Sequence, residues 1–320
     1  MLSANGGIIM GGVGDAIARR TFLGCGLAAA SLTPARAEQD CRLVRHAALD
    51  MIPFGGLVVV ENAIGDKPVK MLVDTGGFLT CFNESKAVEL GLQVQFYPAS
   101  GIVMYGGQGL RRFVTLADFR IGRMRAPQLG YPLLPAGRLP DGIDGLLAPD
   151  FLASFDVEFD FAGGKLNLFS KDHCGKVTYW TDAPVTPISI VREEDQVHIA
   201  AYVMLDGTEI KAVIDTGSSK TLMSLEEARS LLRLERDDPR LTDDHTFNDL
   251  EGTKRFPFKQ MTFGNVQVNN PEIVLVPDRA ARMGPNPPKL ILGMSVLRHL
   301  HMYIAYREKN LYVTDANEHR

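Results

Sequence analysis

The sequence predicts an all-β protein made of two similar lobes, on three observations. The triplet Asp-Thr-Gly occurs twice, at residues 74–76 and 215–217, and each copy follows an apolar run. The sequence around one copy resembles the sequence around the other. Short apolar or alternating segments separated by turn residues fill much of the rest, a pattern typical of strands. Self-similarity over a domain length indicates a duplicated structural unit.

The repeat extends well beyond the two triplets. The aligned segments, first copy before second, are 65–66 with 206–207, 70–73 with 211–214, 146–152 with 291–297, and 157–168 with 302–313. The order of turn, apolar strand, triplet, apolar segment and closing hairpin is therefore the same in both copies. We expect lobes at residues 38–170 and 188–320, joined by a linker at 171–187 that ends near two prolines.

Each predicted strand has a defined place in this order. In the first copy, strands at 57–60 and 69–73 are expected to form a hairpin that leads into Asp74. Near the end of each copy, residues 155–160 and 301–306 alternate between apolar and polar side chains. Because alternation is typical of strands with one solvated face, both are expected to be half-buried.

A short helix is predicted after each triplet. In the first copy it covers residues 83–91, since Asn83 suits the N-cap position and Gly91 the position just past the end. In the second copy, Ser224 and Glu227 have the spacing of a capping box. A helix at the same place in both copies supports the duplication.

Residues 104–109 read Met-Tyr-Gly-Gly-Gln-Gly and lie between apolar segments. They are expected to form the tip of a hairpin, because glycine allows a tip to move and allows another backbone to approach closely. A plain glycine-rich turn is the alternative interpretation. The aligned residues of the second copy, 246–248, contain no glycine, so one such hairpin is expected.

Each copy resembles a subunit of the retropepsin-type aspartic proteases, and the two in one chain resemble the two-lobed pepsin-like arrangement. The resemblance covers about residues 50–170 and 185–315. It implies a two-lobed acid-protease fold, with duplicated retropepsin-like β-barrel lobes and short helices. It also implies that Asp74 and Asp215 form a catalytic pair and that a monomer is sufficient for activity, because both carboxylates belong to one chain.

The resemblance assigns further roles around this pair. Thr75 and Thr216 would brace the two turns by hydrogen bonds across the lobe interface. Gly76 and Gly217 would leave their backbone N–H groups free to approach the carboxylates. The flap over the substrate would be formed by Tyr105, Gly106 and Gly107.

Two carboxylates about 3 Å apart cannot both ionise cheaply, so they share a proton and supply an acid and a base together. Ser218 follows the second triplet, where its hydroxyl is expected to bond Asp215 and favour the ionised form; Gly77 follows the first triplet and offers no hydroxyl. We therefore expect Asp215 to be the more readily ionised member and Asp74 to hold the shared proton.

These features predict an aspartic endopeptidase that cleaves an extended protein or peptide substrate. A catalytically inactive peptide-binding protein with the same fold is the alternative from another class. An enzyme that acts on non-peptide amides is a third possibility. Replacement of either aspartate separates the first two, because only an enzyme would lose hydrolysis.

The first 37 residues are predicted to be a twin-arginine-like signal peptide. Arg19-Arg20 precedes an uncharged run from residue 22 to 33, and Ala35-Arg36-Ala37 is typical of a cleavage site. The run is too short to span a bilayer, so no stable membrane anchor is expected. A periplasmic or secreted location follows from this interpretation; an ordinary N-terminal helix is the alternative.

The net charge bears on the class of binding partner, and the cysteine and histidine content bears on disulfides and metal sites. Removing residues 1–37 takes away three Arg and one Asp, which changes the formal net charge from −4 to −6 and disfavours nucleic acid. Cys41 and Cys174 would bracket the first lobe as a disulfide in an exported protein, with Cys81 left over. The seven His are scattered and no ligand spacing is present, so neither a metal nor a cofactor is predicted.

Overall fold

The computed structural model describes residues 43–97, 102–103, 109–126, 128, 130–171, 178–191, 198–246, 250–277 and 288–317, with the backbone alone at 102–103. The predicted signal peptide, the flap tip at 104–108 and both cysteines of the expected disulfide, Cys41 and Cys174, lie outside these residues. No helix in the described ranges has the length and apolar character needed to cross a membrane.

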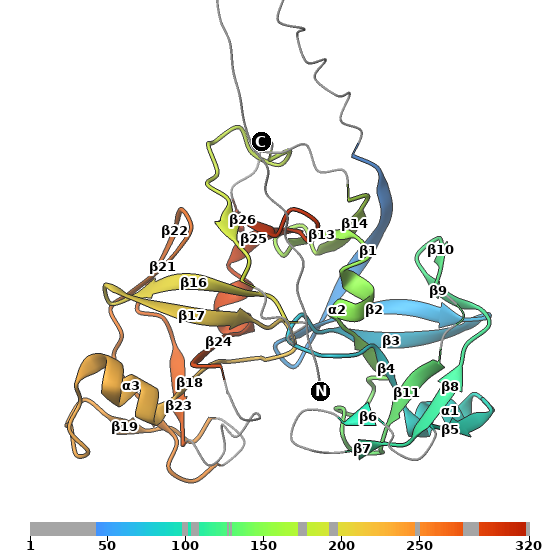
Figure 1. The fold of residues 1–320 in the computed structure, drawn as a ribbon, viewed down its shortest axis with the longest axis horizontal. Coiled ribbons are helices and arrows are strands. Elements are labelled where there is room, and N and C mark those ends of the chain that lie inside the picture. The colour runs from blue at the N-terminus through green and yellow to red at the C-terminus, as the bar shows by residue number, and fades with distance from the viewer. Residues whose placement is uncertain are drawn as a thin grey trace, which may run out of the picture. The chain divides into compact units, whose positions relative to one another are not determined.

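Strands dominate both halves, and the fold class is the predicted one (Figure 1). The first half contains β1 (Arg45–Phe54), β2 (Leu57–Ile64), β3 (Lys67–Val73), β4 (Cys81–Asn83), α1 (Glu84–Glu89), β5 (Val94–Phe96), β6 (Ile102–Val103), β7 (Gly109–Leu110), β8 (Arg112–Thr115), β9 (Phe119–Ile121), β10 (Met124–Arg125), β11 (Gly130–Leu134), β12 (Gly145–Leu147), α2 (Pro149–Leu152), β13 (Asp156–Asp160) and β14 (Lys165–Phe169).

The second half repeats this plan with fewer short strands. It contains β15 (Ile188–Ser189), β16 (Ala200–Leu205), β17 (Thr208–Ile214), β18 (Thr221–Ser224), α3 (Leu225–Leu232), β19 (Thr242–Asp243), β20 (Lys254–Arg255), β21 (Gln260–Phe263), β22 (Val266–Asn269), β23 (Ile273–Val276), β24 (Leu290–Leu292), α4 (Met294–Leu297), β25 (Leu300–Ala305) and β26 (Asn310–Asp315).

The pairing around each triplet is the same in both halves. In the first half β3 pairs with β2 in antiparallel fashion and with β12 in parallel, and β12 also pairs with β4. In the second half β17 pairs with β16 and with β24 in the same senses, and β24 also pairs with β18. Even the register agrees, since Leu72 lies opposite Leu146 and its aligned counterpart Val213 lies opposite Ile291. The repeat in the sequence is thus a structural repeat.

The helices after the triplets begin at the predicted caps. The Asn83 side chain accepts a hydrogen bond from the Ser85 amide at 2.9 Å, and the Ser224 hydroxyl accepts one from the Glu227 amide at 3.1 Å. These oxygens satisfy backbone donors that have no partner within the helix. Gly91 has a φ of +68°, which ends the first helix at little steric cost.

A shared sheet joins the two halves. Its strand order is β15, β26, β25, β13, β14 and β1, and its central contact is the antiparallel pairing of β13 with β25. Val157 lies opposite Ile304, and Phe159 lies opposite Met302. Since Val157 and Met302 are aligned positions of the repeat, this pairing is self-complementary, as expected of a contact on a pseudo-twofold axis.

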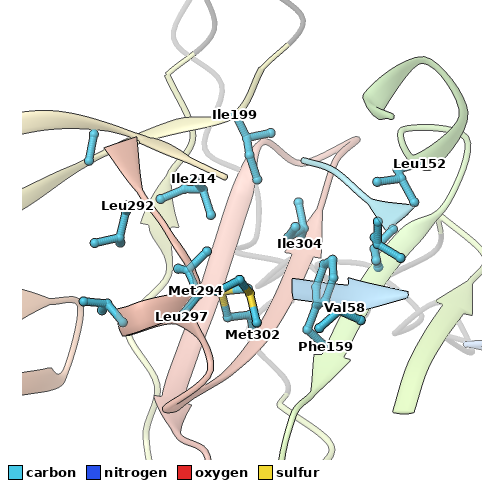
Figure 2. Close-up of a cluster of buried hydrophobic side chains, with 14 of the residues drawn as sticks. Val58, Leu152, Phe159, Ile199, Ile214, Leu292, Met294, Leu297, Met302 and Ile304 are labelled. Carbon is cyan, nitrogen blue, oxygen red and sulfur yellow. The ribbon is translucent and has the colours of Figure 1, made fainter. Parts of the chain in front are cut away.

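One face of this sheet belongs to a core that both halves share. Figure 2 shows Met302 and Ile304 of β25 close to Phe159 of β13, with Ile214 and Leu292 from beside the second triplet in the same cluster. All five side chains are buried. Apolar burial contributes about 25 cal/mol per Å², so this continuous cluster strongly favours association of the halves.

The other face of the sheet is also covered, so the expectation of half-buried strands at 155–160 and 301–306 was wrong. Every residue of β25 is buried, as are four of the five residues of β13. The cover comes from the expected linker: Trp180 is 7% exposed, stacks on the His301 ring at 4.7 Å between centroids, and donates to the Thr314 hydroxyl at 3.1 Å.

The polar side chains on this second face bond to one another. Glu158 accepts from the Asn167 side-chain Nδ2 at 2.6 Å and contacts His301 Nε2 at 2.7 Å. Asp156 accepts from the Tyr306 amide at 3.1 Å and from the Tyr303 hydroxyl at 3.3 Å. Buried acids are tolerated only with such partners, and all of these partners except Asn167 come from the opposite half.

Replacing Glu158 by Ala is expected to lower the free energy of unfolding by about 2–4 kcal/mol, because buried polar groups of both halves lose their acceptor. Urea unfolding measures the loss. Glu226→Ala is the matched control, since Glu226 forms a surface pair with Arg229 and should cost about 0.5 kcal/mol or less. Equal losses for the two variants would contradict a stabilising role for the buried cluster.

Candidate active site

The two aspartates leave their strands at matching points. The Asp74 amide donates to the carbonyl of Leu147 at 2.9 Å, and the Asp215 amide donates to the carbonyl of Leu292 at 3.0 Å. In each half this bond continues the parallel ladder one residue past the end of the strand. The turns are therefore fixed to the strands behind them, and both carboxyl groups leave their lobes from equivalent positions.

Four hydrogen bonds connect the two turns through their threonines. The Thr75 amide donates to the Thr216 hydroxyl, and the Thr216 amide donates to the Thr75 hydroxyl, both at 3.1 Å. Each hydroxyl then donates to the carbonyl that precedes the opposite aspartate, Thr75 to Ile214 and Thr216 to Val73, both at 2.7 Å. Both threonines are fully buried. The bracing role expected of Thr75 and Thr216 has the geometry it requires.

Each glycine of the triplets lies close to both carboxyl groups. The amide of Gly76 donates to Asp74 Oδ1 at 3.1 Å, and the amide of Gly217 donates to Asp215 Oδ1 at 2.8 Å. A Cβ atom on Gly76 would lie 2.6 Å from Asp215 Oδ1, and one on Gly217 would lie 2.5 Å from Asp74 Oδ1. Each glycine thus binds its own aspartate and packs against the other, a contact that no larger residue allows.

The two carboxyl groups are hydrogen-bonded to each other. Burial, followed by the charge and hydrogen bond of Asp215, raises the pKa of Asp74 well above its ordinary value. Burial also raises the pKa of Asp215, but the Gly217 amide, the hydrogen bond from Asp74 and the charge of His198 act in the opposite direction. Asp215 is therefore the member that ionises first, and Asp74 keeps the shared proton.

The direction of this asymmetry is the predicted one, but its expected cause was wrong. The Ser218 hydroxyl donates to the carbonyl of Lys220 at 2.7 Å and not to Asp215. Serine hydroxyls in turns commonly bond a backbone carbonyl close by in the sequence. It is the backbone amide of Ser218 that helps to lower the pKa of Asp215.

A second pair of threonines, which the sequence reasoning did not single out, supports the floor of each turn. The Thr80 hydroxyl accepts from the Ala148 amide and donates to Asp150, at 3.1 and 2.7 Å. The Thr221 hydroxyl accepts from the Gly293 amide at 3.1 Å and contacts the Ser295 hydroxyl at 3.0 Å. Their signal was their equal spacing from the aspartates, six residues after each.

His198 is a further residue of the site that sequence reasoning missed, since the histidines are scattered through the sequence. Its Nδ1 lies 3.1 Å from the carbonyl oxygen of Gly76 in the opposite half. No motif surrounds His198, and its partner is 122 residues away. The sequence carried no signal for this contact.

The predicted flap residues Tyr105, Gly106 and Gly107 lie outside the described residues. The strands that flank them are described: Ile102 pairs with Leu110 and Val103 with Gly109, in antiparallel fashion. A hairpin stem therefore exists where the sequence predicted one.

The Thr75→Val variant tests the bracing threonines, because it keeps the shape of the side chain and removes the hydroxyl. It leaves the Thr216 amide and the Ile214 carbonyl without this partner, and we expect a loss of about 2–5 kcal/mol in the free energy of unfolding. Thr75→Ser, which keeps the hydroxyl, is the control and should lose less than about 1.5 kcal/mol. Indistinguishable urea unfolding of the two variants would contradict this account.

Comparisons with known proteins agree with the geometry. The family described as aspartyl protease matches residues 60–151 and 201–296, one segment in each half. Among solved structures, the aspartic proteinase from Irpex lacteus has a TM-score of 0.54 at 14% identity, covering 85% of this chain and 98% of that chain. Basic 7S globulin from soybean has a TM-score of 0.47 at 11% identity, covering 87% and 95%. No curated protein sequence matches significantly.

At such identities the likeness to the Irpex proteinase is one of fold. The family match rests on the sequence itself, covers more than half of the chain, and contains both triplets and both strands behind them. The chain has the features of a protease-like hydrolase of this type: two lobes, a matching turn in each lobe, and one carboxyl group from each turn that pairs with the other. The chain therefore belongs to the aspartyl protease family.

Proposed function

We propose that the protein is an aspartic endopeptidase that hydrolyses peptide bonds of extended polypeptides with a water molecule activated between Asp74 and Asp215. The observation that carries the proposal is the hydrogen-bonded pair of carboxyl groups, one from each half, with unequal tendencies to ionise. A pair that shares one proton holds a base and an acid at the same place. Peptide hydrolysis without a covalent intermediate needs both.

In the first step, Asp215 takes a proton from water as the water oxygen attacks the peptide carbonyl carbon, and Asp74 gives its proton to the carbonyl oxygen. The product is a neutral tetrahedral diol, with Asp215 protonated and Asp74 ionised. In the second step, the C–N bond breaks as the nitrogen takes the proton of Asp215. A diol hydroxyl returns a proton to Asp74, which restores the starting state of the pair.

The framework supports this division of labour. The Gly76 amide holds Oδ1 of Asp74, and the Gly217 amide holds Oδ1 of Asp215. Donors that are already in place need no reorganisation during the reaction. The hairpin stem of β6 and β7 suits an extended substrate, because a peptide can bind a hairpin by strand addition.

Asp74→Asn and Asp215→Asn are each expected to reduce peptide cleavage by about 100-fold to 10,000-fold, since each removes one half of the acid–base pair. A fluorogenic peptide library, assayed from acid to neutral pH, measures the loss, and circular dichroism confirms folding. Asp66→Asn, an exposed aspartate in the turn between β2 and β3, is the matched control and should be fully active. No cleavage by the wild type, with peptide binding unchanged in both variants, would instead identify a binding protein.

Stability gives a test of the pair that does not need a substrate. The pKa of Asp74 is raised in the folded protein, so the folded state loses stability as pH rises above the ordinary carboxyl pKa. Asp74→Asn removes that cost, and we expect its midpoint of thermal unfolding to exceed that of the wild type by about 2–6 °C at pH 7. Near pH 3.5 the difference should almost vanish. A difference that is equal at both pH values would contradict the raised pKa.

A further inference from the structure

His198 lies two residues before β16, in the second half, and contacts the catalytic turn of the first half. Its Nδ1 is 3.1 Å from the carbonyl oxygen of Gly76. A carbonyl oxygen only accepts hydrogen bonds, so Nδ1 must carry the hydrogen and donate it. The other ring nitrogen, Nε2, takes no part in this contact. The contact therefore remains the same in the neutral and the charged ring.

Gly76 places this ring beside the acid–base pair. The glycine packs directly on the carboxyl group of Asp215, where a Cβ atom would lie 2.6 Å from Oδ1. Asp215 is in turn hydrogen-bonded to Asp74, so these are the two titratable groups of the site that the ring faces. A positive charge on His198 lowers the pKa of Asp215, in agreement with this placement.

The aligned position in the other half carries no imidazole. Counting back from each aspartate by the same number of residues, the position aligned with His198 is Leu57, the first residue of β2. The leucine side chain has no donor, and it packs against the apolar core. The turns, threonines and glycines are symmetric across the two halves. The imidazole is a feature that breaks the symmetry next to the carboxyl groups.

We propose that His198 is a positioning residue which makes Asp215 the ionised member of the pair and extends the singly protonated state of the pair to lower pH. The inference rests on the proposed function for its consequence in catalysis. Histidine carries a proton in the acid range where such pairs gain their second proton. A fixed positive charge beside Asp215 favours its anion, so the pair gains that second proton only at a lower pH.

Two variants separate the charge of His198 from its hydrogen bond. In His198→Asn, the amide nitrogen can occupy the place of Nδ1 and donate to Gly76, but the side chain has no charge. His198→Leu copies the residue of the other half and removes both. The exposed His245 gives the matched control, since His245→Asn removes one imidazole from the surface.

The direct measurement is the titration of the aspartate carboxyl carbons by NMR in ¹³C-labelled protein, with Asp215→Asn used for assignment. We expect His198→Asn to raise the lower apparent pKa of the pair by about half a unit to two units, as for a charge about 6 Å away at an effective dielectric constant of 20–80. The acid limb of the pH profile of kcat/KM should move by the same amount. His245→Asn should leave both unchanged.

Unshifted titration in His198→Asn would overturn the proposal and leave His198 with a purely structural role, visible only in His198→Leu. If the leucine variant does not fold, the asparagine variant still decides. The NMR titration does not depend on turnover. A wild type that cleaves no peptide would therefore contradict the proposed function, but the effect of His198 on the aspartate pair could still be measured. If the wild type is active and His198→Asn leaves the acid limb of the kcat/KM profile at the same pH, the role proposed for His198 is wrong and the proposed function stands.

Discussion

The reciprocal hydrogen bonds between Thr75 and Thr216 are the constraint on which the site depends. Each hydroxyl accepts from the opposite threonine amide and donates to the carbonyl before the opposite aspartate. Both side chains are fully buried, so a partner lost from this arrangement cannot be replaced by water. The separation of the two carboxyl groups is therefore set by the threonine hydroxyls and the backbone groups that they bond, and the aspartate side chains do not have to hold the lobes together against their own repulsion.

A symmetric frame creates a chemical problem, because an acid and a base must differ. The strands, threonines and glycines of the two turns are nearly interchangeable, and by themselves they would give two equivalent carboxyl groups. The amides of Gly77 and Ser218 lower the pKa of Asp74 and Asp215 alike, so they do not make this difference. His198 does: it lies near Asp215, while Leu57 stands at the equivalent position of the other half. Duplication of a lobe supplies the geometry, and later divergence of the copies allows each aspartate a separate role.

The features that occur in both copies of the repeat could be predicted from the sequence. These features are the two triplets, the strands behind them and the helix caps. Each could be recognised because the same pattern occurs at the aligned position of the other copy. The failures concern contacts made once, between distant segments. The acids in β13 suggested a solvated face, but His301 and Asn167 bond them and Trp180 covers them. The Ser218 hydroxyl was expected to bond the carboxylate, because the sequence does not reveal which backbone carbonyl lies within its reach. His198 has no local sequence pattern that could connect it to Gly76.

The threonine bonds also carry a kinetic consequence. They join residues 141 positions apart, and β13 pairs with a strand that lies close to the end of the described chain. Contacts of such long range form late, because the loop between them must close first. A nascent chain that has completed only its first lobe holds a single aspartate and half of each bracing bond. The paired carboxyl groups on which the proposed activity depends are therefore absent from the nascent chain until the second half has folded onto the first.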